Sequence, residues 1–361
     1  MYKGTGISKD QLSDDGEPCI LYGELYTKYK SETIREVISK TNIDNTKLVR
    51  SIANDVIIPC SGETAEDIAT ARCVLNGNIL LGGDLNIIRL HGYDGTFMSY
   101  QLNGKRKYDI AKVAQGVSVV HLYGEHLKGV KTINPCLTEQ KKIASLLALL
   151  DERISTQSKI IEDLKKLKCA IIEKVYSEIQ GKEYSYGQLF DVVNERNKQM
   201  EYSNILSASQ EKGMVNRDDL NLDIQFERSN INTYKIVKKG DYVIHLRSFQ
   251  GGFAFSDKLG VCSPAYTILR PNSILEYGYL SNYFTSQRFI KSLVLVTYGI
   301  RDGRSINVDE WLSMKITIPS KEHQQYIVKM IRSFERKIEN EEAYATQLSI
   351  QKQYLLRQMF I

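Results

Sequence analysis

The sequence predicts an α+β protein in which two long helices join two smaller domains, and three observations support this prediction. Residues 138–179 contain no Gly and no Pro, and their apolar side chains recur in alternating steps of four and three. That spacing is typical of a heptad seam on one long helix. The same pattern returns 184 residues later, in 320–361. The rest of the chain alternates short apolar runs with glycine turns, as small α+β domains do.

The first long helix has a nearly continuous apolar seam. At about 1.5 Å per residue it would be about 63 Å long, which is more than one small domain needs. We therefore expect it to join or align separate domains. Two polar residues, Gln157 and Lys168, interrupt the seam. The apolar members are Ile143, Leu147, Leu150, Ile154, Ile161, Leu164, Ile171 and Val175.

The second helix repeats the first without a gap. A shift of 184 residues places Pro135 on Pro319 and Gln140 on Gln324. Both polar breaks recur, because Gln157 falls on Glu341 and Lys168 on Lys352. Shared breaks are not expected of two unrelated amphipathic helices, so the pattern indicates an internal duplication. The residues expected to pair the helices are Leu147, Leu150, Ile154, Gln157, Lys168, Ile331, Phe334, Ile338, Glu341 and Lys352.

The polar breaks predict a register device. A polar residue buried in a seam fixes pairing geometry at some cost in stability. If the helices pack antiparallel, Lys168 would approach Glu341 and Lys352 would approach Gln157. Replacing Gln157 and Lys168 together with Leu should then raise thermal stability and loosen the register. The alternatives are that these positions are ordinary solvated ones, or that the helices form a dimer interface or stalk.

The domain boundaries follow from these helices. We predict domains at 1–136 and 181–319 and helices at 137–180 and 320–361, with Gly181 ending the first helix. Strands are expected in the first domain at 18–22, 54–59, 77–84 and 85–90, with helical stretches near 97–113. In the second domain, strands are expected at 234–237, 240–246, 265–271 and 314–318, with a helix near 276–292.

Composition restricts the function classes. The chain has 361 residues, 42% of them hydrophobic and 25% charged, and a net charge of +5, which permits nucleic-acid binding without requiring it. The six cysteines form no C-x-x-C pair, which favours free thiols in the cytoplasm. No apolar run is long enough for a membrane span, and residues 1–4 do not resemble a signal peptide.

Several catalytic motifs are missing. The sequence has no G-x-x-x-x-G-K-[ST] phosphate loop. It has no Pro-Pro pair, and therefore no Asn-Pro-Pro-Tyr motif of the kind that adenine methyltransferases use on a flipped base. The five histidines are dispersed, and no carboxylate pair with a lysine stands in a strand context for metal-dependent DNA cleavage. We expect a chain that is non-catalytic by itself and holds no metal.

Two segments resemble the DNA-specificity subunit of Type I restriction-modification enzymes. The first is 133–143, Ile-Asn-Pro-Cys-Leu-Thr-Glu-Gln-Lys-Lys-Ile, and the second is its copy, which runs from Ile316 through Pro319 and Gln324 to Ile327. A strand, a Pro, Glu-Gln and Ile opening a long helix is the pattern of that family. Residues 4–12 and 22–26 also resemble the opening of one of its target-recognition domains.

The resemblance implies a fold and a role. Two α+β target-recognition domains would each read one half of a split DNA site, and antiparallel spacer helices, related by a pseudo-two-fold, would set the gap. The helices would dock two methyltransferase subunits, and restriction subunits would join them. No cofactor is expected in this chain, whereas S-adenosylmethionine, ATP and Mg would belong to the partner subunits. Deleting one heptad, about 10 Å of helix, should change the recognised gap or abolish activity.

The sequence departs from the family pattern in two places. His323 stands in the second copy where the first has Glu139. The second domain opens with a typical family element, 186–193, for which the first half has no equivalent. We therefore expect either that Met1 is an internal start or that the first domain lacks an edge strand.

Candidate DNA contacts lie on stretches that combine glycine with basic, hydroxyl or amide side chains. Bases are read by forked donors and amides, and phosphates are held by cations and hydroxyls. In the first domain the candidates are Lys3, Lys9, Ser61, Thr64, Lys105, Arg106 and Lys107. In the second they are Arg247, Ser248, Gln250, Arg301, Arg304 and Ser305. The alternative for any one of them is a solvated surface position.

The sequence thus predicts a non-catalytic reader of double-stranded DNA that recruits methyltransferase subunits. The alternatives are a protein-interaction adaptor with two domains and a coiled-coil spacer, or a self-contained restriction enzyme. The missing motifs disfavour the enzyme. DNA binding in the presence of competitor DNA separates the reader from the adaptor.

Overall fold

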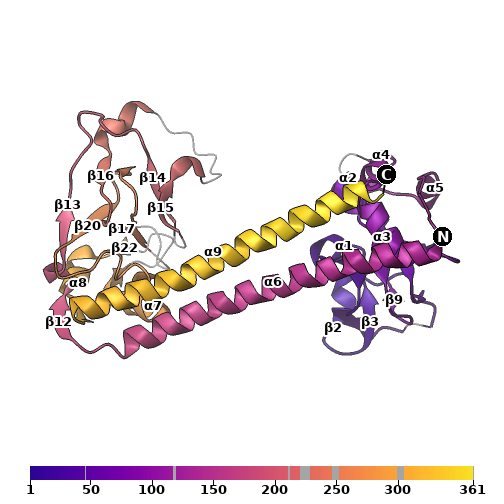
Figure 1. The fold of residues 1–361 in the computed structure, drawn as a ribbon, viewed down its shortest axis with the longest axis horizontal. Helices are drawn as coiled ribbons and strands as arrows, with labels where there is room; N and C mark the ends of the chain where they lie inside the picture. The colour runs from indigo at the N-terminus through magenta and orange to yellow at the C-terminus, as the bar shows by residue number, and fades with distance from the viewer. Residues whose placement is uncertain are drawn as a thin grey trace. The chain divides into compact units, whose positions relative to one another are not determined.

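The computed structural model describes residues 1–44, 46–116, 119–209, 212–219, 228–245, 252–298 and 305–360. Its contacts divide the chain into two compact units (Figure 1). Unit 1 consists of Met1–Ile160 with Glu341–Ile361, and unit 2 is Ile161–Asn340. Two long helices, α6 (Leu137–Ser177) and α9 (Lys321–Gln358), each contribute to both units. The predicted α+β class with two long helices is confirmed.

The helices α6 and α9 pack against each other in opposite senses within each unit. In unit 1, Leu147 near the start of α6 shares a core with Leu356 near the end of α9. In unit 2, Ile172 near the end of α6 shares a core with Ile331 in the first half of α9. The predicted seam is therefore an antiparallel one in both units. No helix in the described part of the chain combines the length and hydropathy that crossing a membrane requires.

Unit 1 is built on two small sheets. One has the order β1-β10-β6-β8-β4 and the other β2-β5-β3-β9. The loop at Gly4 packs tightly on the turn at Gly82, since a Cβ on Gly4 would lie 2.0 Å from the carbonyl oxygen of Gly82. The strands are β1 (Tyr2–Lys3), β2 (Leu12–Ser13), β3 (Glu17–Ile20), β4 (Thr33–Ile34), β5 (Ser39–Thr41), β6 (Asp55–Pro59), β7 (Ser61–Gly62), β8 (Arg72–Val74), β9 (Leu80–Leu81), β10 (Leu85–Ile88) and β11 (Val120–His121).

Short helices cover the sheets of unit 1. Helix α3 packs on β6 and β8, and α4 packs on α2. Phe97 and Tyr100 of α3 join Leu147, Leu356 and Phe360 in one core, so the helix pair is anchored to the domain by apolar contact. The helices are η1 (Lys9–Gln11), α1 (Glu24–Thr27), α2 (Ala65–Ile68), α3 (Gly95–Asn103), α4 (Lys107–Lys112) and α5 (Gly124–Lys128).

Unit 2 is built on the sheet β13-β20-β17-β18 and four two-stranded ribbons, β14-β15, β16-β19, β12-β23 and β21-β22. The strands are β12 (Lys182–Ser185), β13 (Phe190–Val193), β14 (Leu206–Ser209), β15 (Gly213–Asn216), β16 (Lys235–Val237), β17 (Tyr242–Ile244), β18 (Phe253–Phe255), β19 (Gly260–Cys262), β20 (Thr267–Pro271), β21 (Thr297–Tyr298), β22 (Ser305–Ile306) and β23 (Lys315–Ile318).

The helices of unit 2 are short, apart from its shares of α6 and α9. Trp311 on α8 stacks on Tyr186 at 4.2 Å between ring centroids and centres an aromatic core. Ile172, Tyr176, Ile327 and Ile331 bring α6 and α9 into that core. The helices are η2 (Tyr186–Gln188), η3 (Arg217–Asp219), η4 (Arg228–Thr233), η5 (Tyr283–Thr285), α7 (Gln287–Ser292), η6 (Leu293–Val296) and α8 (Val308–Ser313).

The two central sheets have the same antiparallel order. Strands β1, β10, β6 and β8 of unit 1 occupy the places of β13, β20, β17 and β18 of unit 2. The expectation of a missing edge strand in the first domain is therefore wrong, because β1 pairs with β10 through Tyr2 and Lys3. In the described part of unit 1, nothing corresponds to the ribbon of β12 and β23.

Three local predictions differ from the structure. Helix α6 ends at Ser177, before Gly181; Gly181 is instead required by a close approach, since its Cβ would lie 2.1 Å from the carbonyl oxygen of Ile318. The strand expected at 77–84 is confined to β9, Leu80–Leu81. The helix expected near 276–292 is confined to η5 and α7, after a turn in which Gly278 has a φ of 76°.

Candidate nucleic-acid interface

The ends of three strands bring two predicted residues of unit 1 together. Lys3 on β1 pairs in register with Asn86 of β10. The Ser61 hydroxyl on β7 donates to Asp84 Oδ2 at 3.1 Å, just before β10. Burial raises the pKa of the Cys60 thiol to about 11, while the nearby charge of Lys3 acts in the opposite direction. Lys3, Ser61 and Asp84 therefore form one polar site at the strand ends.

Residues 121–126 complete this site, and they are not among the candidates predicted from the sequence. His121 pairs in register with Ser61, and its ring stacks with that of Tyr123, with 6.3 Å between centroids. The Asn86 amide donates to the carbonyl of Leu122 at 2.9 Å, which fixes the turn. Tyr123 is 47% exposed, so an aromatic face is open at this turn. Residues 119–123 include two valines, a leucine and a tyrosine, and this strand-favouring composition could have predicted a strand there.

We define the strand-end patch of unit 1 as Lys3, Ser61, Asp84, His121 and Tyr123. It combines one cation, one hydroxyl, two exposed rings and one carboxylate. Phosphates are held by cations and hydroxyls, and bases make contact with aromatic side chains. The patch therefore has the chemistry of a DNA contact, although Ser61 is 7% exposed and already donates to Asp84.

Two further candidates of unit 1 have local structural roles. Thr64 is the N-cap of α2, because its Oγ1 accepts from the Asp67 amide at 3.1 Å. Its hydroxyl also donates to the Asp67 carboxylate at 2.7 Å. Lys9 is exposed on η1, beside a capping box formed by Ser8 and Gln11. The Thr64 hydroxyl is thus engaged, whereas the Lys9 ammonium is open to solvent.

The basic stretch Lys105–Lys107 lies at the joint between α3 and α4. The joint is tight, since a Cβ on Gly104 would lie 3.1 Å from the carbonyl oxygen of Leu356 on α9. Arg106 pairs with Asp109 at 3.4 Å and is mostly covered, and Lys107 begins α4. Of the three, Lys105 is exposed. The stretch therefore belongs to the end of the helix pair rather than to the strand-end patch.

The candidate DNA contacts of unit 2 lie mostly outside the residues that the structure describes. Arg247, Ser248, Gln250, Arg301 and Arg304 lie outside the described residues, as does the side chain of Ser305, whose backbone begins β22. The flanking residues are described. The His245 amide donates to the carbonyl of Gly252 at 2.7 Å and extends the pairing of β17 and β18. Burial lowers the pKa of His245.

In each unit, an equivalent ion pair between an arginine and an aspartate holds the central strand of the sheet. Arg89 donates to Asp55 through Nε at 3.1 Å and Nη2 at 3.0 Å. Arg270 donates to Asp241 in the same two-pronged way, at 3.0 Å from each nitrogen. Both aspartates also accept from a backbone amide three residues earlier, at 2.8 Å. These arginines are therefore structural, and they position β6 and β17 before the candidate loops.

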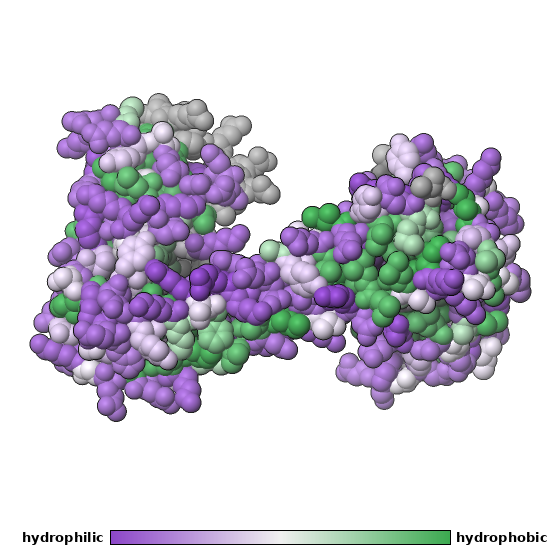
Figure 2. All heavy atoms as spheres, viewed as in Figure 1, coloured by the Kyte–Doolittle hydropathy of each residue, from purple (hydrophilic) through white to green (hydrophobic). Residues whose placement is uncertain are grey.

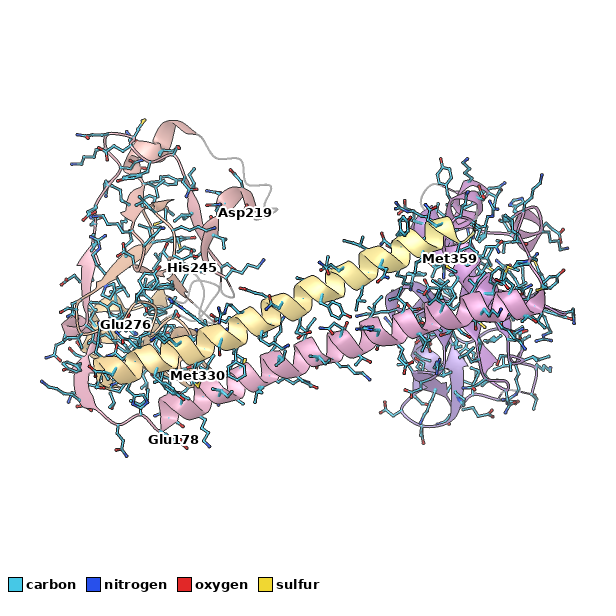
Figure 3. All side chains as sticks on the ribbon, in the orientation of Figure 1. Glu178, Asp219, His245, Glu276, Met330 and Met359 are labelled. Atoms are coloured by element: carbon cyan, nitrogen blue, oxygen red, sulfur yellow. The ribbon has the colours of Figure 1, made fainter. Side chains whose placement is uncertain are left out.

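A glutamine near the start of each long helix clamps it to its own domain. Gln140 Oε1 accepts from the Asp94 amide at 2.9 Å, and Gln324 Oε1 accepts at 2.7 Å from the amide of Glu276, the residue labelled in Figure 3. Each Nε2 donates to the carbonyl of the proline five residues earlier, at 2.8 and 3.0 Å. The duplication thus repeats a buried contact, since both glutamines are 1% exposed.

The polar breaks of the seam have other partners than predicted. Lys168 binds Glu335 at 2.7 Å in unit 2, and not Glu341. Lys352 binds Asp151 at 2.6 Å in unit 1, and not Gln157. The two carboxylates are 184 residues apart, so one ion pair is made twice. The predicted partners were wrong because Asp151 and Glu335 each lie one residue beyond a seam position, outside the apolar pattern.

Gln157 and Glu341 occupy equivalent positions of the two copies and contact each other. The Gln157 Nε2 donates to the Glu341 carboxylate and, at 3.3 Å, to its carbonyl. Gln157 is 5% exposed. Two of the three equivalent apolar pairs match, since Leu147 and Ile331 are buried and Leu150 and Phe334 are partly buried. The third pair differs, because Ile154 is partly buried and Ile338 is buried.

Unit 1 adds a second carboxylate to its ion pair. Lys352 Nζ also lies 2.5 Å from Glu32 Oε2, and the Tyr100 hydroxyl donates to Asp151 at 2.6 Å. Burial raises the pKa of Glu32 and the charge of Asp151 adds to this, whereas Lys352 opposes it. In the described chain, no group of three or more His, Cys, Asp and Glu residues is arranged to hold a metal ion.

Two α+β units that share one duplicated helix pair define the class of this fold. Residues 181–349 match the sequence model of the Type I restriction modification DNA specificity domain. The fold is similar to that of the S subunit of a Type I restriction-modification system from M. genitalium, with a TM-score of 0.55 and 16% identity over 100% of this chain and 93% of that one.

A second solved structure, from work on complex assembly and conformational transition of the type I R-M system, has a TM-score of 0.56 and 15% identity over 90% of this chain and 86% of that one. A search of curated proteins gave no match. Residues 181–349 therefore match a Type I restriction modification DNA specificity domain, and the fold of the chain is similar to that of Type I S subunits.

Proposed function

We propose that each unit reads one half of a split double-stranded DNA site in the cytoplasm, and that α6 and α9 set the gap between the halves. The same helices would recruit two methyltransferase subunits, which restriction subunits then join. S-adenosylmethionine, ATP and Mg would act in those partners. The chain itself supplies recognition and spacing.

The proposal rests on one observation. The ion pairs that hold the helices and the central strands occur in both units, whereas the sequences of the loops after the strands differ. The pairs Lys168–Glu335 and Lys352–Asp151 fix the helices in both units. The pairs Asp55–Arg89 and Asp241–Arg270 fix the central strands. A protein that repeats its frame and varies the loops after its strands is suited to reading two different sequences with one geometry.

In unit 1 we assign the DNA contact to the strand-end patch. Lys3 and the exposed Tyr123 would meet the backbone and the groove, with His121 beside them, since cations position the duplex and side chains in the grooves read it. Lys9 and Lys105 would add phosphate contacts of lower specificity. Asp84 disfavours phosphate at the centre of the patch, which favours a base edge there as its partner.

In unit 2 we assign the reading side chains to the segments that follow β17 and β21. Arg247 and Gln250 have the forked and amide groups that recognise guanine and adenine in the major groove. Arg301 and Arg304 would do the same or hold phosphates. Support for this assignment comes from the residue types and from the paired strands on either side of each segment.

The test uses the full chain with its methyltransferase subunits. Gel shifts on a library of duplexes should select two short sequence blocks separated by a fixed unread gap. Binding should resist competitor DNA that lacks either block. Binding without sequence preference would favour the protein-interaction adaptor, and a single continuous block would contradict the two-headed reading.

A further inference from the structure

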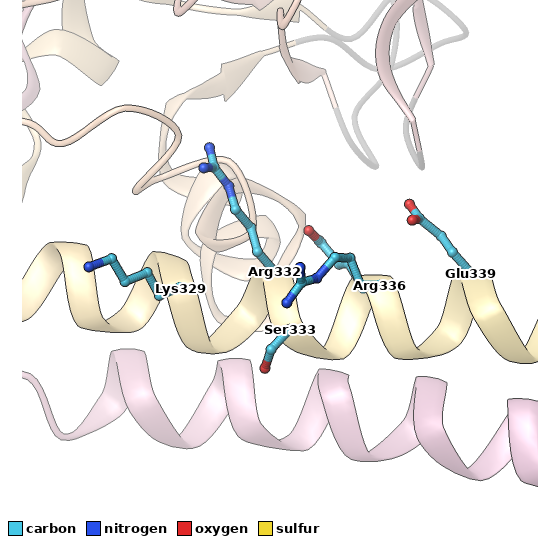
Figure 4. Close-up of a pocket in the computed structure, with 6 residues that line it drawn as sticks. Lys329, Arg332, Ser333, Arg336 and Glu339 are labelled. Atoms are coloured by element: carbon cyan, nitrogen blue, oxygen red, sulfur yellow. The ribbon is translucent and has the colours of Figure 1, made fainter.

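One face of α9 in unit 2 is strongly basic and hollowed. Lys329, Arg332 and Arg336 follow one another at steps of three and four, so they share a face. They line an open hollow of about 400 Å³ with Ser333, Glu335 and Glu339 (Figure 4). Figure 4 shows Arg332 extending away from α6, while Ser333 turns toward it. The visible surface of this part of α9 is hydrophilic (Figure 2).

The three cations of this face have no carboxylate partner in the described chain. Glu335, the nearest acidic group in sequence, is engaged by Lys168 on α6 at 2.7 Å. Arg332 lies instead over the ring of Tyr277, 5.6 Å from its centroid. Like charges four residues apart destabilise a helix, so stability alone does not account for Arg332 and Arg336.

The duplication shows that the helix pair does not need these charges. The positions of α6 that correspond to Lys329, Arg332 and Arg336 are Ser145, Ala148 and Glu152. The packing positions on either side match in the two copies, whereas this face changes from neutral or acidic to basic. The basic face was therefore added to one half of a frame that folds without it.

We propose that Lys329, Arg332 and Arg336 bind the phosphate backbone of the DNA on which unit 2 reads its half-site, outside the bases that are read. Guanidinium groups match phosphate oxygens with two parallel donors, and an open hollow suits a backbone better than a small molecule. Glu339 at its end would limit how far the strand follows the helix. The inference rests on the proposed DNA-reading function and deepens it.

Continuity with the reading segment supports this occupant. The Tyr277 ring beneath Arg332 meets Phe255 edge-on, with 5.2 Å between centroids. Phe255 is on β18 and pairs with Tyr242 of β17, the two strands that flank 246–251. A DNA strand held by the basic face would therefore lie against the packed layer that contains β17 and β18, the strands on either side of 246–251 in the sequence.

The experiment measures the salt dependence of DNA binding by the complete complex with methyltransferase subunits. Arg332→Gln with Arg336→Gln should lower the slope of log Kd against log salt by about two, with the preference between specific and unrelated DNA unchanged. Arg332→Lys with Arg336→Lys should keep the slope. The matched control is Lys142→Gln with Lys159→Gln, two exposed lysines of α6 in unit 1, which should leave the slope as it is.

The possible results distinguish failure of the proposed phosphate contact from failure of the proposed DNA-reading function. If the unaltered complex binds specifically and the Gln pair keeps the full slope, the phosphate contact is wrong and the reading function stands. An equal loss of slope in the control would mean a general charge effect and would also overturn the contact. Loss of methyltransferase binding by the Gln pair, with DNA binding per complex unchanged, would assign the face to an acidic protein surface. A complex that ignores sequence would overturn the proposed function itself.

Discussion

Lys352 Nζ lies 2.6 Å from Asp151 Oδ1 in unit 1, between α9 and α6. The same contact recurs in unit 2 as Lys168 with Glu335 at 2.7 Å. The surroundings differ, because Lys352 has Glu32 as a second partner and is 13% exposed, whereas the side chains of Lys168 and Glu335 are 23% and 35% exposed. One ancestral contact has become a buried network in one unit and a partly solvated pair in the other.

The first prediction compares the two lysines. Lys352→Met should lower the free energy of unfolding by about 3–5 kcal/mol, because it leaves two buried carboxylates without their cation. Lys168→Met should cost about 1 kcal/mol or less, as partly exposed pairs do. Urea unfolding of each variant measures both values. Equal losses would contradict the difference in burial, and Lys352→Arg serves as the charge-preserving control.

The second prediction concerns pH. The pKa of Glu32 is raised above its ordinary value of 4.5 by burial and by Asp151, so the folded state holds this proton more tightly than the unfolded state. Its contribution to stability is present below pH 4.5 and is lost as the pH rises through the folded pKa. Between pH 4.5 and neutrality, stability should therefore fall less steeply in Glu32→Gln than in the unaltered chain. Unfolding midpoints across that window measure the slopes, and identical slopes would rule out Glu32 as their source.

The third prediction concerns the polar contact at the centre of the seam. Replacing Gln157 and Glu341 together with Leu should raise the unfolding temperature, because well-packed apolar residues are often more stable than a buried polar pair. It should also loosen the register, as loss of a polar seam residue does in coiled coils. Calorimetry measures the first effect, and disulfide trapping between cysteines placed on α6 and α9 measures the second. An unchanged melting temperature would indicate that the pair is solvated.

The fourth prediction separates base reading from backbone holding. Arg247→Ala should relax specificity at one base position at a cost of about 1–3 kcal/mol, whereas Lys105→Ala should weaken binding to all sequences and lower the salt slope by about one. Tyr123→Ala should reduce affinity for the half-site of unit 1 with that of unit 2 unaffected. Binding to duplexes altered in one half at a time measures these effects. A Tyr123 variant that weakens both halves equally would argue against the strand-end patch.

The long helices and their duplication were predictable because a heptad seam is a local pattern repeated many times. Comparison of the two helix copies could also have predicted the ion pairs, since Asp151 and Glu335 are equivalent residues of the two copies. They were missed because partners were sought only among the breaks of the seam. The contact of Glu32 could not be predicted, because Glu32 is distant in sequence from both long helices and no local pattern marks it as buried.

The strand-end patch shows the same limit. Lys3 and Ser61 were selected by residue type, yet their meeting depends on β1, a strand of two residues whose pairing with β10 has no periodicity to detect. Thr64 has a side chain of a type that contacts DNA, but in the structure it serves as a helix cap. Residue type therefore indicated candidates, and the sheet order decided which of them share a site.

A methylation map of cells that carry this chain with its partner subunits would show whether two units read two DNA blocks at a spacing set by α6 and α9. We expect two short sequence blocks with a fixed gap, and a changed gap or loss of methylation when seven facing residues are removed from each of α6 and α9. An uninterrupted recognition sequence, or a gap of the same length after the helices are shortened, would contradict it.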